Sequence, residues 1–370
     1  MYPNPRNFTR RVRYLALLLL SYVPAYIMWF YDVVGCLRNR DLDNLTRQLS
    51  IGIPIMFCQF KLIVATVLRK QLLSLIEEIN NDYESYNHLD KLYQDIVEEN
   101  RSIILSLERM WTVMVVVVSG IFPFTASILT FVYYITDVDK RAMVHEVDVP
   151  FLREGRYDTP YFEIIFAYML FVVFTLAVCY IGYDGLFFIC IYHSCLKLKL
   201  VSARLLRLCE NPNDVYRMNK NIGEIVEEQC MSFRFVMRVQ KTYELWLMMV
   251  FVLTSLQLCV SLFQILTSEG GSIDFRYIVF ITGAILHIYV PCYLTTNVPT
   301  SNEEVALAAY RSGWESVSDS SLRRSISFII ARAQKPLFIK AMDIIVFDMH
   351  LFVFVMQKSY SVFTLLRPKD

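Results

Sequence analysis

Charged residues are scarce in this chain of 370 residues, because aspartate, glutamate, lysine and arginine together make up only 19% of it. An average soluble domain carries about 25%. Apolar residues account for 55% of the sequence and aromatic residues for 14%, and the mean hydropathy is +0.41. This composition is typical of membrane proteins. The formal net charge of +1 gives no indication of a nucleic-acid partner.

The sequence also lacks the motifs of catalysis, metal binding and nucleotide binding. Its cysteines follow no CxxC or CxxH spacing, so a metal site is not expected. No GxxxxGK(S/T) phosphate loop is present, which argues against an ATP-driven pump. The histidines recur in no Ser–His–Asp or metal spacing; they are His88, His145, His193, His287 and His350. We therefore expect neither an enzyme nor a bound cofactor.

The nine cysteines lie mostly in apolar runs, or in loops that the topology below assigns to the cytosol, where thiols stay reduced. We interpret them as small packing residues. They are Cys36, Cys58, Cys179, Cys190, Cys195, Cys209, Cys230, Cys259 and Cys292.

No cleavable signal peptide is indicated at the N-terminus. Arg6, Arg10, Arg11 and Arg13 precede an apolar run. That run is too long for a signal peptide and lacks a convincing small-residue cleavage site. We therefore interpret it as the first membrane helix.

Seven apolar runs are long enough to cross a bilayer, which requires about 20 mostly apolar residues. The second run is the weakest, because it contains Pro54 and Lys61. The fourth and seventh are longer than a bilayer requires, so one end of each should project into water. The runs are Tyr14–Tyr31, Leu49–Leu68, Met110–Ile135, Tyr161–His193, Tyr243–Leu266, Tyr277–Val298 and Ala341–Leu366. We expect an all-α membrane protein with seven transmembrane helices.

The distribution of lysine and arginine sets the orientation. With the N-terminus in the cytosol, 24 of these residues lie in cytosolic segments and ten in extracellular segments. The excess of positive charge inside favours this arrangement and places the C-terminus outside the cell. It is opposite to that of G-protein-coupled receptors, and the chain also lacks their Asp-Arg-Tyr and NPxxY motifs.

The predicted cytosolic segments are amphipathic at helical spacing. Apolar residues recur on one face within 71–109, within 197–241 and within 303–335. Such helices, continuing from the spans, indicate a packed cytosolic domain. Independent surface helices are the alternative. We favour a contact between subunits, because three segments each have an apolar face to bury.

These patterns divide the chain into six parts. They are a cytosolic N-terminus (1–13), spans one to four with their loops (14–196), a cytosolic anchor segment (197–242), spans five and six (243–298), a second anchor segment (299–340), and the seventh span with a short extracellular C-terminus (341–370).

Three motifs in the last part of the chain resemble those of one known family. The first is IYVPCYLTTNVPTSNEEVALAAYRSGWES, which carries Tyr289, Cys292, Ser301, Ala309, Tyr310 and Trp314. The others are RAQKPL at Arg332–Leu337 and SYSVFTLLR at Ser359–Arg367. Together they cover about a fifth of the chain and resemble insect odorant receptors, in the odour-tuning branch. Val290-Pro291 departs from the family pattern and suggests a local break in the sixth helix.

The resemblance implies a subunit of a ligand-gated, non-selective cation channel in olfactory sensory transduction. Such a subunit assembles with a shared olfactory co-receptor into a heterotetramer in the lipid membrane of the sensory neuron dendrite. Its partners would be the co-receptor, a small volatile odorant, membrane lipid and permeating cations. A gustatory receptor-type channel and a secondary transporter are the alternatives. A gustatory receptor would be expected to end its seventh span with Thr-Tyr and Gln-Phe, and this chain has Ser359-Tyr360 and Leu366-Arg367.

By the same resemblance the seventh helices would line a central pore. Ser359, Phe363 and Arg367 are four residues apart and share one helical stripe. Phe363 and Arg367 match the family's gate positions, and an apolar ring there could block ions by dewetting. Alternatively, Phe363 packs within its own subunit and Arg367 extends to the interface. Lys358 would line a wet part of the pore or pair with a carboxylate.

Two acidic residues lie near the predicted cytosolic end of the same span. Asp343 and Asp348 could attract cations to an inner pore exit, or they could cap helices and pair with other residues.

An odorant pocket should be a closed, mostly apolar cavity with a few polar groups. The expected orientation places it in the outer halves of spans two, three, four and six. Methionine adapts in shape and aromatic rings stack on flat ligands, although ordinary helix packing is the alternative for each residue. The candidates are Ile53, Met56, Phe57, Phe60, Phe124, Thr125, Ile128, Tyr133, Tyr161, Ile165, Tyr168, Met169, Val172, Tyr277, Phe280, Ile281 and Ala284.

Overall fold

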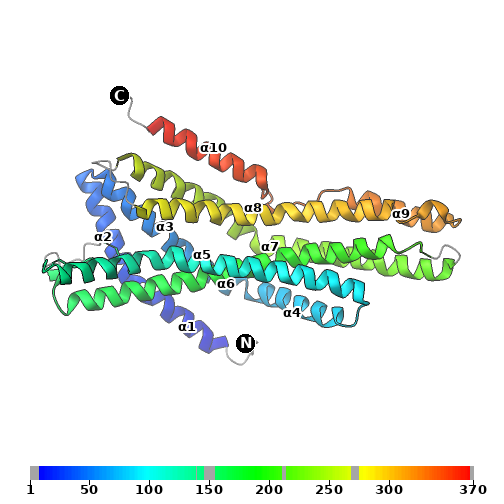
Figure 1. Cartoon of the computed structure of the whole chain (residues 1–370), viewed down its shortest axis with the longest axis horizontal. Helices are drawn as coiled ribbons and strands as arrows, with labels where there is room; N and C mark the ends of the chain where they lie inside the picture. Colours follow the sequence, from blue (N-terminus) through cyan, green and yellow to red (C-terminus); the bar gives the residue numbers. More distant parts are fainter. Residues whose placement is uncertain (1–7, 139, 146–154, 211–213, 268–274, 367–370) are drawn as a thin grey trace.

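A computed structural model describes residues 8–138, 140–145, 155–210, 214–267 and 275–366. These residues form a bundle of long helices that run roughly along one axis (Figure 1). The helices are α1 (Phe8–Ser21), α2 (Val23–Asn39), α3 (Leu42–Val67), α4 (Arg69–Tyr86), α5 (Lys91–Ile135), α6 (Tyr161–Leu206), α7 (Val215–Thr267), α8 (Phe275–Tyr310), α9 (Ser320–Ala333) and α10 (Met349–Leu366). A hairpin of β1 (Lys340–Ala341) and β2 (Ile345–Val346) precedes α10, and two 3₁₀ turns occupy Gly155–Tyr157 and Trp314–Ser316.

The first predicted span is two helices with a break at Tyr22. Pro24 lies in the first turn of α2, where a missing backbone N–H is tolerated. The hydroxyl of Tyr168 lies in the break. It accepts from the Ala25 N–H at 3.1 Å and donates to the Ser21 carbonyl at 2.8 Å. In an unbroken helix these two backbone groups would bond to each other, so the tyrosine replaces the missing bond.

Three helices are much longer than a bilayer requires. α5 has 45 residues, α6 has 46 and α7 has 53. At 1.5 Å per residue, α7 extends about 80 Å, against a hydrocarbon core of about 30 Å. The amphipathic segment predicted within 197–241 is therefore the end of α6 and the start of α7. The segment within 71–109 contains most of α4 and the first part of α5.

The connections between helices alternate between two ends of the molecule. The end of α4 and start of α5, the end of α6 and start of α7, and the end of α8 and start of α9 lie toward the right of Figure 1, whereas the end of α5 and start of α6, and the end of α7 and start of α8, lie at the left. The segments 69–109, 197–241 and 299–340 include the helix ends at the right and hold 20 of the 36 lysines and arginines, so this end corresponds to the predicted cytosolic side. Within the described residues, six helical segments are long and apolar enough to cross a membrane. The 18-residue α10 is not among these six and corresponds to the predicted seventh span.

The last helix begins at Met349, later than the predicted start near Ala341. The preceding residues form the antiparallel hairpin, with Lys340 opposite Val346 and Ala341 opposite Ile345. Met342 and Asp343 adopt left-handed backbone angles in its turn, with φ of 51° and 58°. Apolar composition alone could not distinguish this buried hairpin from an extra helical turn.

Side-chain bonds fix the two acidic residues of this region. The Asp343 carboxylate accepts from the Gln240 amide at 2.9 Å, and the Asp348 carboxylate accepts from the Leu351 N–H at 2.9 Å, at the start of α10. Asp343 therefore pairs with a side chain of α7, and Asp348 caps the first turn of α10.

Prolines do not interrupt the helices in which they lie. α3 continues through Pro54, α5 through Pro123, and α8 through Pro291 and Pro299. The break that Val290-Pro291 suggested is therefore absent from α8.

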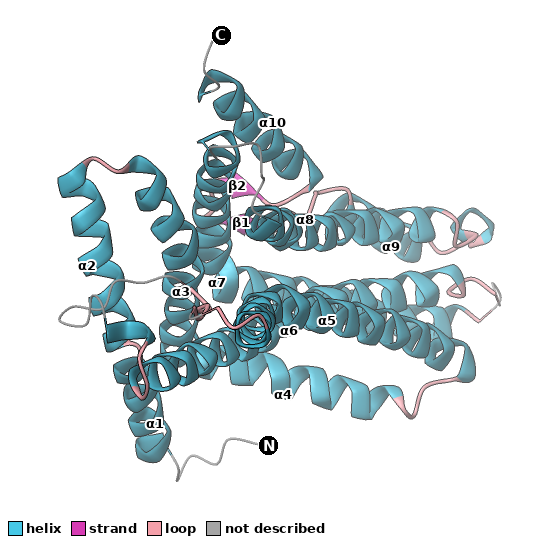
Figure 2. Cartoon of the chain, turned by 60° about the vertical axis from the view of Figure 1, so that its left-hand side comes forward, coloured by secondary structure: helices cyan, strands magenta, loops and turns pink. Residues whose placement is uncertain are grey.

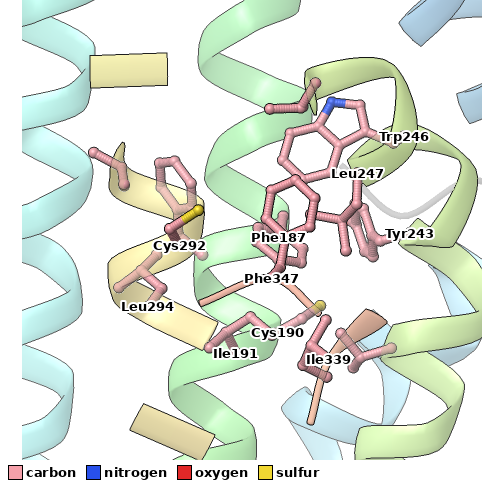
Figure 3. Close-up of a cluster of buried hydrophobic side chains, with 14 of the residues drawn as sticks. Phe187, Cys190, Ile191, Tyr243, Trp246, Leu247, Cys292, Leu294, Ile339 and Phe347 are labelled. Carbon is pink, nitrogen blue, oxygen red and sulfur yellow. The ribbon is translucent and has the colours of Figure 1, made fainter. Parts of the chain in front are cut away.

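The main apolar core lies where α6, α7 and α8 meet the hairpin. Phe187 of α6 packs on Tyr243 and Trp246 of α7, with ring centroids 5.0 and 4.8 Å apart (Figure 3). Cys292 of α8 and Phe347, after the hairpin, belong to the same buried cluster. This core holds the root of α10 against the bundle.

A second apolar core lies at the cytosolic end. It is formed by the ends of α6 and α8, the start of α7, and α9, which packs beside α8 (Figure 2). Its buried residues include Leu205, Ile222, Val305 and Ile326. The amphipathic faces expected to be buried therefore pack largely against one another within the chain.

The cysteines are free thiols, and most are packing residues as predicted. The buried ones are Cys58, Cys179, Cys190, Cys195, Cys209 and Cys292.

Candidate functional site

A cavity of about 220 Å³ lies within the membrane part of the bundle. Its walls come from α3, α5, α6, α7 and α8, and the extracellular segment after α5 adds Val144 and His145. Most of its lining is apolar and aromatic, which suits a small uncharged molecule.

Six of the predicted pocket residues line this cavity. They come from α3, α6 and α8, which are three of the four spans named from the sequence. The residues are Ile53, Phe57, Val172, Tyr277, Phe280 and Ala284.

The candidates from α5 lie too far toward the extracellular end. Phe124 is 67% exposed and Ile128 is also exposed, so both face the lipid in this single chain. Thr125 and Tyr133 line a second, more polar cavity of about 670 Å³ near the extracellular surface. The two cavities share Phe122 and Val144.

The remaining candidates lie outside the lining. On α6, Tyr161 is exposed, Ile165 and Met169 are half-buried, and Tyr168 bonds the break between α1 and α2. On α3 and α8, Met56 is exposed, whereas Phe60 and Ile281 pack against the main core. Ligand contact by these residues remains a prediction, and the geometry gives no support for it.

The sequence reasoning missed the deeper lining. On α5 it comprises Trp111, Met114, Val115, Val118, Ser119 and Phe122, and on α7 Leu253, Thr254 and Gln257. Arg47, Ile51, Pro54 and Ile55 of α3, Val173, Leu176 and Tyr180 of α6, and Gly283 and His287 of α8 also line the cavity without having been predicted. The signal that could have found part of this set is polarity, because Thr254, Gln257 and His287 are buried polar residues inside membrane spans.

A segment outside the membrane covers the cavity. Arg141 bonds Glu163 at the start of α6 at 3.1 Å. Ala142 exchanges hydrogen bonds with the Thr130 hydroxyl of α5, at 3.0 and 3.2 Å. His145 contacts the Gln48 amide of α3 at 3.0 Å. The segment is thus tied to three helices around the cavity.

A buried ion pair lies directly below the cavity. The Lys61 ammonium of α3 is 2.8 and 2.9 Å from the two carboxylate oxygens of Asp184 on α6, and the side chains are 0% and 1% exposed. Charges buried at this depth are stable only when paired. The lysine that lowers the apolar character of the second predicted span therefore has a structural explanation, because Lys61 of α3 pairs with Asp184 of α6.

Aromatic side chains connect this ion pair to the cavity. The Lys61 ammonium lies 3.4 Å from the Tyr180 ring centroid and 4.5 Å from that of Phe57. Both rings line the cavity. Such cation–π contacts are strongest where water is excluded. A ligand in the cavity would therefore press on rings that touch the buried lysine.

His287 of α8 completes the floor. Its Nε2 lies 3.3 Å from an Asp184 carboxylate oxygen, and its Nδ1 lies 3.3 Å from the Thr254 hydroxyl oxygen. The imidazole also contacts the Phe57, Trp111 and Tyr180 rings, at centroid distances of 5.3 to 6.1 Å. The floor therefore joins α3, α5, α6, α7 and α8 through side chains.

The floor is continuous with the main core. Tyr183 is the residue before Asp184, and its ring packs on Tyr243 and Trp246 of α7 at 5.5 and 5.9 Å. These rings belong to the cluster that encloses Phe347 (Figure 3). From there the Phe347 carbonyl accepts from Thr295 of α8 at 2.7 Å, and the Met349 N–H donates to Thr296 at 3.2 Å. Packed contacts thus extend from the cavity floor to the first residue of α10.

The predicted pore residues have different environments on α10. Lys358 is exposed, with its ammonium 5.6 Å from the Phe354 ring centroid, and Phe363 is half-buried. Ser359 is buried. Arg367 lies outside the described residues.

α10 diverges from the rest of the bundle toward the C-terminus (Figure 1). Val353, Phe354, Tyr360 and Val362 on this helix are exposed in the single chain. An apolar face of this kind must meet lipid or another subunit.

A second polar cluster lies at the cytosolic side, between α4 and α6. The Lys197 ammonium is 2.6 Å from the Asp82 carboxylate and 3.2 Å from Glu78, and His193 Nε2 is 2.8 Å from Asp82. Glu78 also pairs with Arg238 of α7. Burial acts to raise the pKa of Asp82, but the hydrogen bonds from His193 and Lys197 outweigh it and hold that pKa below its ordinary value. The cluster joins three helices where they leave the membrane.

Comparisons with known proteins agree with this architecture. A sequence model described as "7tm Odorant receptor" matches residues 41–360. Odorant receptor 30a of Drosophila melanogaster is 24% identical over 345 residues, covering 91% of this chain and 88% of the relative. Putative odorant receptor 92a of the same species is 22% identical over 350 residues, covering 94% and 84%.

Solved structures share the fold. The insect olfactory receptor OR5 from Machilis hrabei superposes with a TM-score of 0.73 at 16% identity, over 94% of this chain and 87% of that one. Its complex with eugenol gives a TM-score of 0.76, also at 16% identity, over 99% and 92%. At this identity the likeness establishes the seven-helix fold. Together with the match over most of its length, it identifies the chain as a member of the insect odorant receptor family, and thus a receptor rather than an enzyme.

Proposed function

We propose that this chain is the odour-binding subunit of a heteromeric, ligand-gated, non-selective cation channel. The observation that carries the proposal is the apolar cavity within the membrane bundle, whose floor is linked by packed side chains to the root of α10. A cavity alone would suit any receptor. Its continuity with α10, which diverges from the bundle, suits a channel in which ligand binding moves a pore helix.

The ligand of this cavity would be a small volatile molecule. The lining is mostly apolar, and Trp111, Phe57 and Phe280 offer faces on which a flat ligand could stack. A solved relative of the same fold has been captured in complex with eugenol. We extend binding of a molecule of that size to this chain by analogy.

α10 would line the pore at the centre of a tetramer. Its exposed face, which includes Lys358, would meet the equivalent helices of neighbouring subunits. Phe363 and Arg367 stay the candidate gate residues, whereas Ser359 is buried against its own chain and is the weakest of the four candidates. An arginine at the mouth of a cation pore repels cations, so one copy per tetramer is tolerated better than four. This favours a heteromer with an olfactory co-receptor.

The cytosolic helices would provide the principal contact between subunits. Their amphipathic faces pack within the chain, yet Tyr216, Leu307, Tyr310 and Phe328 remain exposed around that domain. Exposed apolar and aromatic residues of this kind are typical of interfaces. The segments 197–242 and 299–340 would thus anchor the tetramer, and 341–370 would form the pore.

Gating would follow from unequal affinity for two states. A ligand that binds the open arrangement more tightly shifts the equilibrium toward it by that difference in free energy. Here the difference would arise at the rings above Lys61, and the core shown in Figure 3 would carry the displacement to α10. By analogy with the family, the site of action would be the plasma membrane of a sensory neuron dendrite.

Two-electrode recording in oocytes tests the proposal. The chain is expressed alone and with an olfactory co-receptor, and surface expression is measured in both. A panel of volatile aromatics, esters, alcohols and ketones is then applied. We expect odour-evoked cation current only in the co-expressing cells.

Each other outcome has a definite meaning. Robust current from the chain alone would refute the obligate heteromer. Substrate uptake without conductance would replace the channel by a transporter.

A further inference from the structure

The deep end of the cavity contains a chain of four polar side chains that reaches from a buried charge pair to the ligand space. Lys61 pairs with Asp184, Asp184 faces His287 Nε2 at 3.3 Å, and His287 Nδ1 faces Thr254 at 3.3 Å. His287 and Thr254 line the cavity, whereas the charge pair lies behind them. An ion pair with only a structural role would not need His287 and Thr254.

The carboxylate determines which imidazole nitrogen carries the proton. A nitrogen lone pair 3.3 Å from a carboxylate would be repelled by it, whereas an N–H there is attracted. The neutral imidazole therefore places its proton on Nε2. Nδ1 is left as a hydrogen-bond acceptor beside the cavity. Lys61 bonds both oxygens of the Asp184 carboxylate and holds it in this position, directly behind the cavity lining.

A second acceptor lies one helical turn along α7. Gln257 lines the same cavity and is 6% exposed. Its amide nitrogen donates to the Ser261 hydroxyl at 3.2 Å, and its Oε1 accepts no hydrogen bond from the residues that the structure describes. A buried acceptor without a donor is costly. His287 and Gln257 thus provide two acceptors, and the Thr254 hydroxyl is the donor placed between them.

At the deep end of the cavity, the acceptors His287 Nδ1 and Gln257 Oε1 outnumber the Thr254 donor, and this imbalance decides what that end should bind. An ether, ester or ketone brings only acceptors, so the Thr254 hydroxyl would still be the one donor for Nδ1, and Gln257 Oε1 would stay without a donor. An alcohol or phenol supplies the missing donor, and its oxygen can still accept from the Thr254 hydroxyl.

We infer that the cavity selects small uncharged molecules with a hydroxyl group, which donates to His287 Nδ1 or Gln257 Oε1, and that Lys61 and Asp184 are the positioning pair that holds the imidazole in the accepting form. This inference rests on the proposed odorant-binding function and specifies its ligand class.

The test uses pairs of isomers that differ in hydroxyl against ether. They are benzyl alcohol with anisole, 2-phenylethanol with benzyl methyl ether, and 1-hexanol with methyl pentyl ether. Within a pair, composition and size are nearly constant. We expect the alcohol to activate the co-expressed channel at a concentration about tenfold lower than its ether, the equivalent of one satisfied buried acceptor. Equal potency across all pairs would overturn the inference.

Binding is measured in parallel on the purified chain in nanodiscs. Trp111 lines the cavity, so its fluorescence reports occupancy, and a Trp111→Phe variant identifies its share of the signal. Alcohol-selective binding without current would refute the channel and leave the ligand class intact. Odour-evoked current without alcohol selectivity would refute the ligand class and leave the proposed channel function intact.

Three variants have predicted signs. His287→Phe keeps the aromatic contacts and removes Nδ1, and Gln257→Leu removes Oε1, so each should reduce the alcohol-to-ether preference several-fold. Thr254→Val removes the internal donor and should increase it. Thr282→Val, on the exposed side of α8, is the matched control and should leave the preference unchanged.

The positioning pair is tested by selectivity, because stability alone would not distinguish it. Lys61→Met with Asp184→Leu removes both charges and frees the imidazole proton to occupy either nitrogen. We expect a smaller alcohol preference at normal surface expression. An unchanged preference in this double variant would refute the positioning role.

Discussion

At the scale of single residues, the described membrane part of this receptor depends on a few polar groups with fixed partners. The hydrocarbon core offers no water, so each buried polar atom must be satisfied by the protein. Tyr168 and Lys61 illustrate this requirement in different ways. The Tyr168 hydroxyl replaces a backbone hydrogen bond, and the Lys61 ammonium pairs with the Asp184 carboxylate.

Tyr168→Phe should destabilise the fold and leave ligand potency unchanged. The change removes the hydroxyl that bonds Ser21 and Ala25, leaving a carbonyl and an N–H unpaired. We expect a loss of about 1–3 kcal/mol, measured as a lower melting temperature in detergent. Tyr161→Phe, at an exposed site on the same helix, is the control. A shift in odorant potency without loss of stability would instead return Tyr168 to the ligand site.

Lys61→Met should be far more harmful than the paired change Lys61→Met with Asp184→Leu. The single variant leaves a buried carboxylate uncompensated, at a cost of about 3–5 kcal/mol. The double variant removes both charges and should recover most of that stability. Thermal unfolding of the three proteins in nanodiscs measures the coupling. Additive losses would mean that the two side chains do not act as a pair.

At the scale of elements, each long helix continues from the predicted membrane region into the predicted cytosolic region. α6 passes from the cavity wall to the cytosolic core without a break. On the same helix, the polar cluster that joins α4, α6 and α7 lies between the cavity and the cytosolic core.

Asp82→Asn should weaken the junction between α4 and α6 and reduce the dependence of stability on acid. The folded state holds the Asp82 pKa below its ordinary value. The carboxylate therefore stabilises the fold above about pH 4, the ordinary value of an aspartate, and this contribution is lost as pH falls through the lower folded-state value. We expect a loss of about 1–3 kcal/mol at neutral pH.

The measurement for Asp82 is chemical unfolding of the purified receptor between pH 3 and 7. Asp95→Asn, at an exposed aspartate on α5, is the control. The stability difference between Asp82→Asn and the unchanged chain should shrink as pH falls. A difference that stayed constant down to the lowest pH would contradict the assignment.

At the scale of the whole molecule, a single chain is incomplete. α10 diverges from the bundle with an exposed apolar face, and aromatic residues remain exposed around the cytosolic core. Both features suit an assembly in which neighbouring subunits cover these surfaces.

Cysteine accessibility along α10 tests where its faces lie in the assembled channel. Phe354→Cys is on the exposed face and Val355→Cys on the buried one. If the exposed face lines the pore, a charged thiol reagent should reduce current through Phe354→Cys channels by at least about half, and faster with odorant present. Val355→Cys should not react. Equal reaction at both positions would exclude a pore on that face. The unsubstituted chain, whose Cys230 is exposed, provides the background.

The sequence by itself determined the membrane class, the seven membrane-spanning segments with their approximate positions, the helical continuation of several spans, and the family. These depend on local composition, on the distribution of lysine and arginine, and on short motifs. They can be read without knowing which helices touch. Ile53, Phe57, Val172, Tyr277, Phe280 and Ala284 were found because each points inward on a helix that does border the cavity.

Only the tertiary structure decided the depth of the cavity, the participation of α7 and the hairpin before α10. Lys61 and Asp184 are 123 residues apart, and no periodicity relates them. Thr254 and His287 could not be assigned to the cavity for the same reason. A polar residue in a membrane helix indicates that a polar partner exists, but the sequence does not identify that partner. Partner choice depends on how helices pack and rotate against one another, and that is a property of the assembled bundle.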